Sequence, residues 1–319
     1  MLNLVLLLLG FIPLIYGANL LVDSASSLAK KLNVPSIIIG LTIIAFGTSA
    51  PELTINIFAS LKGNSDIVLG NIVGSNIFNI AGILGISAII YPLAINKKTT
   101  WIEIPLCFLA ALVVFVIASD GFIDGDKVSV IKRTDGIILL LFFAVFIGYI
   151  IRFMMSSSYT DDSPAAKQHS VALYVVLIII GLVLLVVGGR IIVLFAIKFA
   201  HQIGLSERII ALTVVSIGTS FPELATNIIA AKKRNIDLAV GNIIGSNIFN
   251  AFFVLGISAV ISPVFVHDRS FFDLCVNLFI SFLLFLFIFT GKGRKIDRWE
   301  GIIFVILYIG YIVMLFKMP

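Results

Sequence analysis

Long runs of uncharged, apolar residues constrain the fold of this chain more than any other feature. The five clearest runs are Met1–Val22, Leu32–Pro51, Ile67–Asn96, Ser170–Gly189 and Leu238–Val266. Five others are shorter or carry a charge, namely Ile104–Ser119, Gly136–Ile151, Arg208–Ala231, Leu274–Gly291 and Gly301–Phe316. A helix of about 20 apolar residues crosses the hydrocarbon core of a bilayer. The residues are 60% hydrophobic and only 12% charged, which is too little polar surface for a soluble domain. The runs do not alternate as barrel strands do. The sequence therefore predicts an all-α polytopic membrane protein with ten transmembrane helices.

The second half of the chain repeats the first at an offset of 171 residues. Residues 42–90 and 213–261 align without a gap and are identical at 28 of 49 positions. Each half holds five predicted spans, and because five is odd, the second copy must enter the membrane from the opposite side. We therefore expect two inverted five-helix repeats related by an axis in the membrane plane. Their predicted limits are 1–154 and 170–319, joined by a polar linker over 155–169.

Basic residues predict how the chain lies in the membrane. With the N-terminus outside, thirteen Lys and Arg residues fall on the cytoplasmic side and eight on the outer side. Cytoplasmic loops carry an excess of Lys and Arg. We therefore expect a multi-pass protein of the cell membrane with both termini outside. The net charge of +5 comes from these short loops, so it does not indicate a nucleic-acid partner.

The strongest part of the repeat is a broken-helix motif, "GTSAPEL" at 47–53 and "GTSFPEL" at 218–224. Pro51 lacks an N–H group, and its ring collides with the carbonyl of Gly47 four residues earlier. Pro222 and Gly218 repeat this arrangement. Irregular backbone at membrane depth is tolerated only where it is buried in protein or lines a cavity. Each motif therefore predicts a broken helix with free carbonyl groups inside the protein.

A carboxylate follows each break. Glu52 is the only charged residue between Lys31 and Lys62, and Glu223 is its counterpart. An ionisable residue inside a membrane span is expensive and indicates a functional site. Neutral oxygen donors accompany the two acids: Thr48, Ser49, Ser75 and Asn79 in the first half, and Thr219, Ser220, Ser246 and Asn250 in the second. Histidine and thiolate are missing from this set, so it suits hard cations such as Ca²⁺ rather than transition metals.

Simpler interpretations apply to parts of this pattern. An intramembrane Glu can be a structural partner for Lys or Arg, but the motif segments contain no basic residue. The glycines of "GNIVGSN" also permit close helix packing. Asn76 and Asn247 suit helix–helix hydrogen bonds better than ion coordination.

At these motifs the sequence resembles the calcium/cation antiporter superfamily, and most closely the prokaryotic sodium/calcium exchangers. Their two repeats carry G-T-S-x-P-E and G-N-x-x-G-S-N, as both halves do here. The resemblance implies that broken helices 2, 3, 7 and 8 form an ion-binding core along which helices 1 and 6 slide. It implies calcium ligands at Glu52, Glu223, Thr48 and Thr219. It implies sodium ligands at Ser49, Ser75, Ser220, Ser246 and the carbonyls of Ala45 and Ser216.

Two positions depart from the family pattern. Some relatives carry aspartate at the position of Asn250, so this site has two carboxylates rather than three. Arg190 lies where relatives often have an acidic or polar residue, and we expect it to reach the outer interface rather than gate the site.

The resemblance implies Na⁺-driven Ca²⁺ extrusion by alternating access, with three Na⁺ exchanged for each Ca²⁺. Exchange of Ca²⁺ or another cation for H⁺ is the alternative, because buried glutamates can carry protons. A passive cation channel belongs to a different class and would need an open pore. No Ser/His pair, HExxH motif or phosphate loop indicates an enzyme. We expect Ca²⁺ and Na⁺ as substrates and the lipid bilayer as the surroundings, with no cofactor and no protein partner implied.

Overall fold

The computed structural model describes residues 2–96, 99–123, 125, 128–156, 169–202, 218–290 and 294–317. The helices of the first half are α1 Leu2–Lys31, α2 Ser36–Ile39, η1 Gly40–Ile44, α3 Ala45–Thr48, α4 Ala50–Leu61, α5 Ser65–Ile77, η2 Phe78–Leu84, α6 Gly85–Ile90, η3 Thr99–Glu103, α7 Ile104–Ile117, α8 Asp120–Ile123 and α9 Arg133–Ser156. Those of the second half are α10 Val171–Gln202, α13 Phe221–Lys232, α14 Ile236–Ile248, η5 Phe249–Val254, α15 Leu255–Ile261, α16 Asp268–Phe287 and α17 Arg298–Lys317. The four η elements are π-helical.

The described residues form eight helices long and apolar enough to cross a membrane, or nine when a bent pair counts as one span. The predicted span Arg208–Ala231 lies partly outside the described residues, and α13 covers its second part. Large apolar side chains such as Leu141, Val145 and Ile306 are exposed on the outer helices. Such a surface needs hydrocarbon rather than water around it, as the composition predicted.

The helix breaks take two forms. Between α3 and α4 the chain bends by 47° at Ser49, which has φ −86° and ψ 8°. Ser220, before α13, has nearly the same backbone conformation, φ −89° and ψ 12°. The spans α5–η2–α6 and α14–η5–α15 instead run through π-helical segments. Such segments frequently occur at functional sites because they re-aim side chains within a helix.

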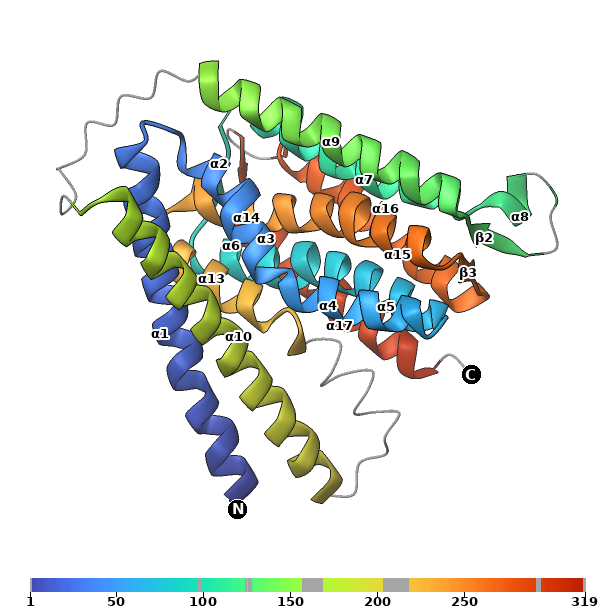
Figure 1. The fold of residues 1–319 in the computed structure, drawn as a ribbon, viewed down its shortest axis with the longest axis horizontal. Helices are drawn as coiled ribbons and strands as arrows, with labels where there is room; N and C mark the ends of the chain where they lie inside the picture. The colour runs from blue at the N-terminus through green and yellow to red at the C-terminus, as the bar shows by residue number, and fades with distance from the viewer. Residues whose placement is uncertain are drawn as a thin grey trace.

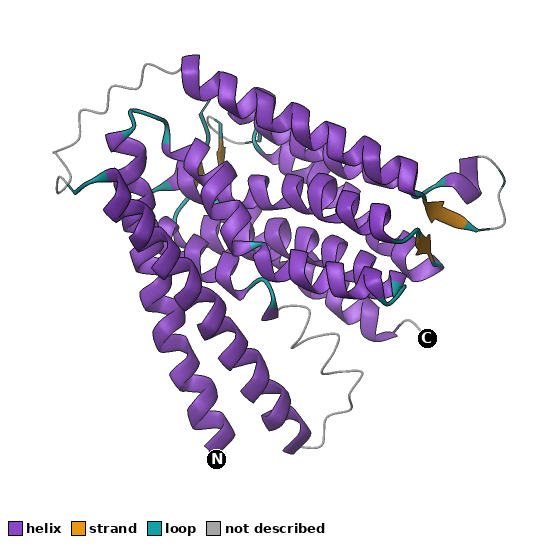
Figure 2. Ribbon diagram, viewed as in Figure 1, coloured by secondary structure: helices purple, strands orange, loops and turns teal. Residues whose placement is uncertain are grey.

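Two small antiparallel strand pairs join the halves of the chain. Strand β1 (Leu93–Ala94) pairs with β4 (Lys295–Ile296), and β2 (Ser129–Ile131) pairs with β3 (Val264–Val266). Each pair takes one strand from each half. Figure 2 shows that these strands are short connections in an otherwise helical molecule.

Helices α1 and α10 lie side by side and extend away from the rest of the bundle (Figure 1). Glycines allow their backbones to come close. A Cβ atom added to Gly17 would lie 2.8 Å from the carbonyl oxygen of Gly181, and one added to Gly181 would lie 3.0 Å from that of Gly17. Small residues are typical of such close crossings in membranes.

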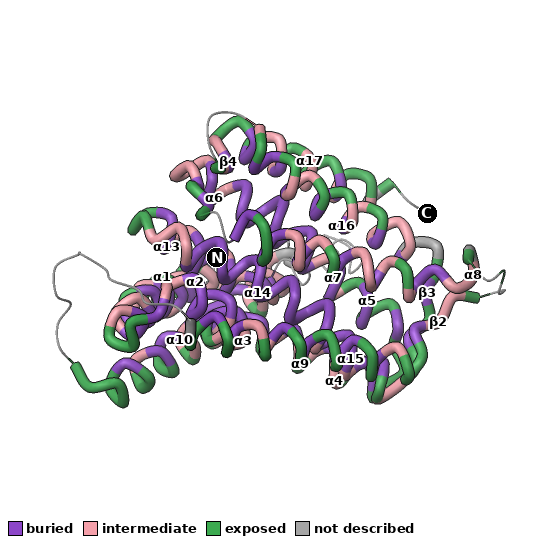
Figure 3. The backbone as a smooth tube through the Cα atoms, turned by 90° about the horizontal axis from the view of Figure 1, so that it is seen from above, coloured by how far each residue is buried: buried purple, intermediate pink, exposed green. Residues whose placement is uncertain are grey.

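The buried segments gather in the middle of the bundle, around α14 (Figure 3). The spans Ser65–Ile90 and Ile236–Ile261 are the most buried of the described spans. They carry the two copies of the second motif, so the fold places the repeated polar residues at its centre.

Candidate cation-binding site

The two motif glutamates are buried at the starts of two helices. Glu52 lies in the first turn of α4 and Glu223 in the first turn of α13, and each is 1% exposed. The N-terminus of a helix carries a partial positive charge, which favours a carboxylate there. The break before each helix therefore provides a favourable position for a charge that would otherwise be costly to bury.

Each glutamate accepts a hydrogen bond from a serine of the other half. Ser49 Oγ donates to Glu223 Oε1 at 2.9 Å, and Ser220 Oγ donates to Glu52 Oε1 at 3.1 Å. Ser220 Oγ also lies 3.3 Å from Ser75 Oγ. These contacts bring five of the predicted site residues together in one cluster. The two motifs therefore contribute to a single buried polar cluster, which is the candidate site.

Four asparagines connect the two central spans, Asn76 of α5 and Asn79 of η2 in the first half with Asn247 of α14 and Asn250 of η5 in the second. Asn76 and Asn247 donate to each other's backbone carbonyl at 3.3 and 3.2 Å. Their side-chain oxygens accept hydrogen bonds from Asn250 and Asn79 at 3.1 and 2.9 Å. Asn76 and Asn247 thus serve the helix contact, as the sequence favoured. Because Asn79 and Asn250 use their NH₂ groups in these bonds, their carbonyl oxygens point elsewhere.

Five buried side-chain oxygens of the predicted site residues have no hydrogen-bond partner within the described part of the chain, where other buried oxygens such as Thr226 Oγ1 and Asn277 Oδ1 also lack one. The five are Glu52 Oε2, Glu223 Oε2, Asn79 Oδ1, Asn250 Oδ1 and Ser246 Oγ. Both halves of the chain contribute to this set. An unpaired buried acceptor is costly unless something positive compensates it. No group of three or more His, Cys, Asp or Glu residues that could together hold a metal ion occurs among the described residues, so the set is two carboxylates with neutral oxygens. Such a set fits a hard cation.

The remaining predicted residues that the structure describes, Thr48, Ala45 and Thr219, differ in their surroundings. Thr48 Oγ1 donates to the carbonyl of Ile44 at 3.0 Å and lies 3.3 Å from Asn242 Oδ1. The carbonyl of Ala45 accepts the N–H of Ser49 at 3.0 Å. Thr219 is half-buried beside Ser220. Ser216 lies outside the described residues.

Several buried or half-buried polar residues near the site were not singled out from the sequence. Asn71 donates to Asn56 Oδ1 at 2.6 Å and to the backbone carbonyl of Glu52 at 3.3 Å. In the second half, Asn227 donates to the backbone carbonyl of Glu223 at 3.0 Å. These asparagines hold the helix turns that carry the two acids. Their repetition at the 171-residue offset was the signal that could have identified them.

Two other acidic residues, Glu103 and Asp273, accept hydrogen bonds from tyrosine hydroxyls. Glu103 is fully buried and accepts a hydrogen bond from the hydroxyl of Tyr149. Asp273 accepts one from the hydroxyl of Tyr311 at 2.9 Å. Tyr149 and Tyr311 occupy matching places in the related segments "FIGYII" and "YIGYIV". These pairs connect α9 to the start of α7, and α17 to α16.

A multi-pass helical protein with a buried, oxygen-rich pair of acidic motifs belongs to the class of membrane cation transporters. The sequence pattern of the sodium/calcium exchanger protein family matches residues 2–152 and 173–317. The chain therefore belongs to the sodium/calcium exchanger family, whose members are cation antiporters rather than enzymes.

Individual relatives match over nearly the whole chain. The putative antiporter CaxA of Alkalimonas amylolytica is 34% identical over 331 residues, covering 98% of each chain. The sodium/calcium exchanger MaX1 of Methanosarcina acetivorans is 32% identical over 349 residues, again covering 98% of each. The solved structure of the sodium-calcium exchanger NCX_Mj soaked with Na⁺ and Sr²⁺ is 34% identical, covers 98% of both chains and superimposes with a TM-score of 0.83.

Proposed function

We propose that this protein exchanges Na⁺ for Ca²⁺ across the membrane by alternating access, at one site shared by the two halves. The crossed serine–glutamate hydrogen bonds carry this proposal, because they join Glu52 and Glu223 in one buried cluster. The remaining ligands are those predicted from the sequence, namely Thr48, Ser49, Ser75, Asn79, Ala45, Thr219, Ser220, Ser246, Asn250 and Ser216. The names of MaX1 and NCX_Mj, a sodium/calcium and a sodium-calcium exchanger, support these ions as substrates.

The charge of the site indicates how the two ions exclude each other. Two ionised carboxylates give it a charge of about −2, which is costly to move through hydrocarbon. One Ca²⁺ neutralises the site. Three Na⁺ leave it at about +1, so the step that carries sodium moves one positive charge. Each such charge gains ~2.3 kcal/mol per 100 mV of membrane potential. We propose three Na⁺ per Ca²⁺ and electrogenic Ca²⁺ extrusion.

The proposed organisation follows the two repeats, 1–154 and 170–319, with the linker 155–169 between them. The strand pairs β1–β4 and β2–β3 support this arrangement, because strands near 93 and 264 occupy matching places in the two halves. The excess of basic residues in the predicted cytoplasmic loops supports a cell-membrane location with both termini outside.

Transport into vesicles tests the function directly. Reconstituted protein is given external ⁴⁵Ca²⁺ with either an outward Na⁺ gradient or an outward H⁺ gradient. We expect uptake with the Na⁺ gradient only. Uptake driven by the H⁺ gradient alone would replace the proposal with Ca²⁺/H⁺ exchange. Uptake that follows the Ca²⁺ gradient and needs neither counter-ion would indicate a channel.

A further inference from the structure

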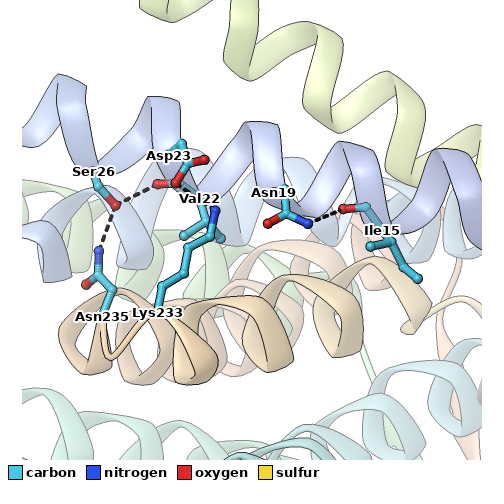
Figure 4. A network of polar contacts seen from close by, with 7 residues as sticks. All are labelled: Ile15, Asn19, Val22, Asp23, Ser26, Lys233 and Asn235. Atoms are coloured by element: carbon cyan, nitrogen blue, oxygen red, sulfur yellow. Dashed lines mark hydrogen bonds and ion pairs between the residues drawn. The ribbon is translucent and has the colours of Figure 1, made fainter. Parts of the chain in front are cut away.

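Polar contacts connect the α1–α10 pair to the bundle at one end of α1 (Figure 4). Lys233 Nζ lies 2.7 Å from Asp23 Oδ1, and Asn235 Nδ2 donates to Ser26 Oγ at 2.7 Å. Asp23 and Ser26 are three residues apart, so they lie on the same face of α1. Both partners lie in the short turn between α13 and α14. One face of α1 therefore binds the α13–α14 turn through an ion pair and a hydrogen bond.

The turn is built to present these two groups. Asn235 Oδ1 accepts the backbone N–H of Leu238 at 3.2 Å and so caps α14. Its NH₂ group is left to reach Ser26. The hydroxyl of Ser26 donates to the carbonyl of Val22 at 2.6 Å, which leaves its oxygen to accept from Asn235. Each group in this chain of hydrogen bonds has a definite donor or acceptor role.

The corresponding turn in the first half, between α4 and α5, has the same lysine and asparagine, but α10 lacks polar residues at the positions that match Asp23 and Ser26. At the 171-residue offset, Lys233 and Asn235 correspond to Lys62 and Asn64 in the turn between α4 and α5. Asn64 caps α5 by accepting the N–H of Ile67 at 3.1 Å, just as Asn235 caps α14. However, the positions that match Asp23 and Ser26 are Leu194 and Ile197 on α10. Apolar side chains there cannot form an ion pair or accept a hydrogen bond.

We infer that Asp23 and Ser26 form a one-sided latch with Lys233 and Asn235, which biases the protein towards the conformation in which α1 lies against the α13–α14 turn. In an inverted repeat, the two access states exchange the surroundings of the two halves. Identical halves would give these states equal free energy, so residues that differ between the halves set the bias. The latch is such a difference. It rests on alternating access, but not on which ions are carried.

The expected size of the effect follows from the exposure of the ion pair. The side chains of Lys233 and Asp23 are 33% and 66% exposed, so water and salt screen their attraction. An exposed pair of this kind shifts an equilibrium by about two- to fivefold. The latch therefore tunes the ratio of the two states and does not lock the protein.

The test measures the position of α1 by double electron–electron resonance, in a Cys275→Ala background. One spin label is placed at Tyr16 on α1 and the other at Phe58 on α4, both of which are exposed. The two access states should give two different distances between the labels. Asp23→Asn and Lys233→Met should each raise, by about two- to fivefold, the population of the distance that belongs to the state in which α1 does not lie against the α13–α14 turn. The charge reversal Asp23→Lys with Lys233→Asp should restore the wild-type distribution.

Lys62→Met is the matched control, because it removes the corresponding lysine from the turn without a carboxylate opposite. It should leave the distribution unchanged. Unchanged distances in Asp23→Asn, or an equal change in Lys62→Met, would overturn the latch. If one of the single variants does not fold, the charge reversal provides the test. A folded reversal variant in which the population of the other access state is still raised would also overturn the latch. Because the labels report position and not transport, failure of the latch is distinct from failure of Na⁺/Ca²⁺ exchange in vesicles.

Discussion

Replacing Glu52 with glutamine removes one charge from the proposed site and little else. The side chain keeps its shape, and its carbonyl oxygen can still accept the hydrogen bond from Ser220, which is 3.1 Å in the wild type. The oxygen that has no partner among the described residues, Oε2, becomes an NH₂ group, which cannot bind a cation. The charge of the site falls from about −2 to −1.

The loss of Ca²⁺ affinity should be large. Removing one partner of a buried charge pair costs about 3–5 kcal/mol, and each 1.4 kcal/mol is a factor of ten in affinity. We therefore expect Glu52→Gln to weaken Ca²⁺ binding by about 100- to 4,000-fold and to abolish exchange. The folded protein should remain intact, because an unpaired buried charge has been removed rather than created.

Glu300→Gln is a suitable control. Glu300 is also fully buried, but it accepts hydrogen bonds from Thr290 Oγ1 and the N–H of Asp297 near the start of α17, away from the motifs. Calorimetric titration with Ca²⁺ should give wild-type affinity for this variant and an affinity about 100- to 4,000-fold lower for Glu52→Gln. Thermal unfolding in detergent should show both proteins folded. Normal Ca²⁺ affinity and transport in Glu52→Gln would refute the assignment of the site.

Three further predictions concern charge, voltage and packing. Asn250→Asp places a third carboxylate beside two others, so like-charge repulsion favours its protonated form. Because that proton must leave before the carboxylate can bind a cation, the Ca²⁺ affinity of the variant should rise with pH. An unchanged pH profile would remove Asn250 from the site. The rate of Na⁺-driven Ca²⁺ transport in proteoliposomes clamped with K⁺ and valinomycin should depend on voltage, whereas indifference to voltage would indicate two Na⁺ per Ca²⁺. Gly17→Ala should lower the free energy of unfolding by about 1–3 kcal/mol, because its Cβ would lie 2.8 Å from the Gly181 carbonyl oxygen. Gly148→Ala, with open space around its Cβ, should not lower it. Thermal unfolding compares the two variants, and equal melting temperatures would contradict the close crossing of α1 and α10.

Local chemistry made much of the architecture predictable. Pro51 has no N–H in any fold, so the break before Glu52 follows from the sequence alone, and the structure has a 47° bend there. The lengths of the apolar runs also predicted membrane spans from local sequence, because a helix forms all its backbone hydrogen bonds within one continuous segment. The 171-residue repeat showed that Glu223 shares the setting of Glu52. These features depend on residues close together in the sequence or on a pattern that is copied within it.

Tertiary structure decided which residues meet across the two halves. The sequence placed Ser49 and Glu223 in one candidate list but could not show that their atoms lie 2.9 Å apart. Asn76 and Asn79 both donate to Asn247, but only the fold shows that Asn76 Oδ1 accepts a hydrogen bond while Asn79 Oδ1 has no partner among the described residues. Asp23 gave no signal at all until the fold placed it beside Lys233. Such pairings depend on how helices far apart in the sequence pack and rotate, because a hydrogen bond requires atoms within about 3 Å, and no local pattern sets that distance.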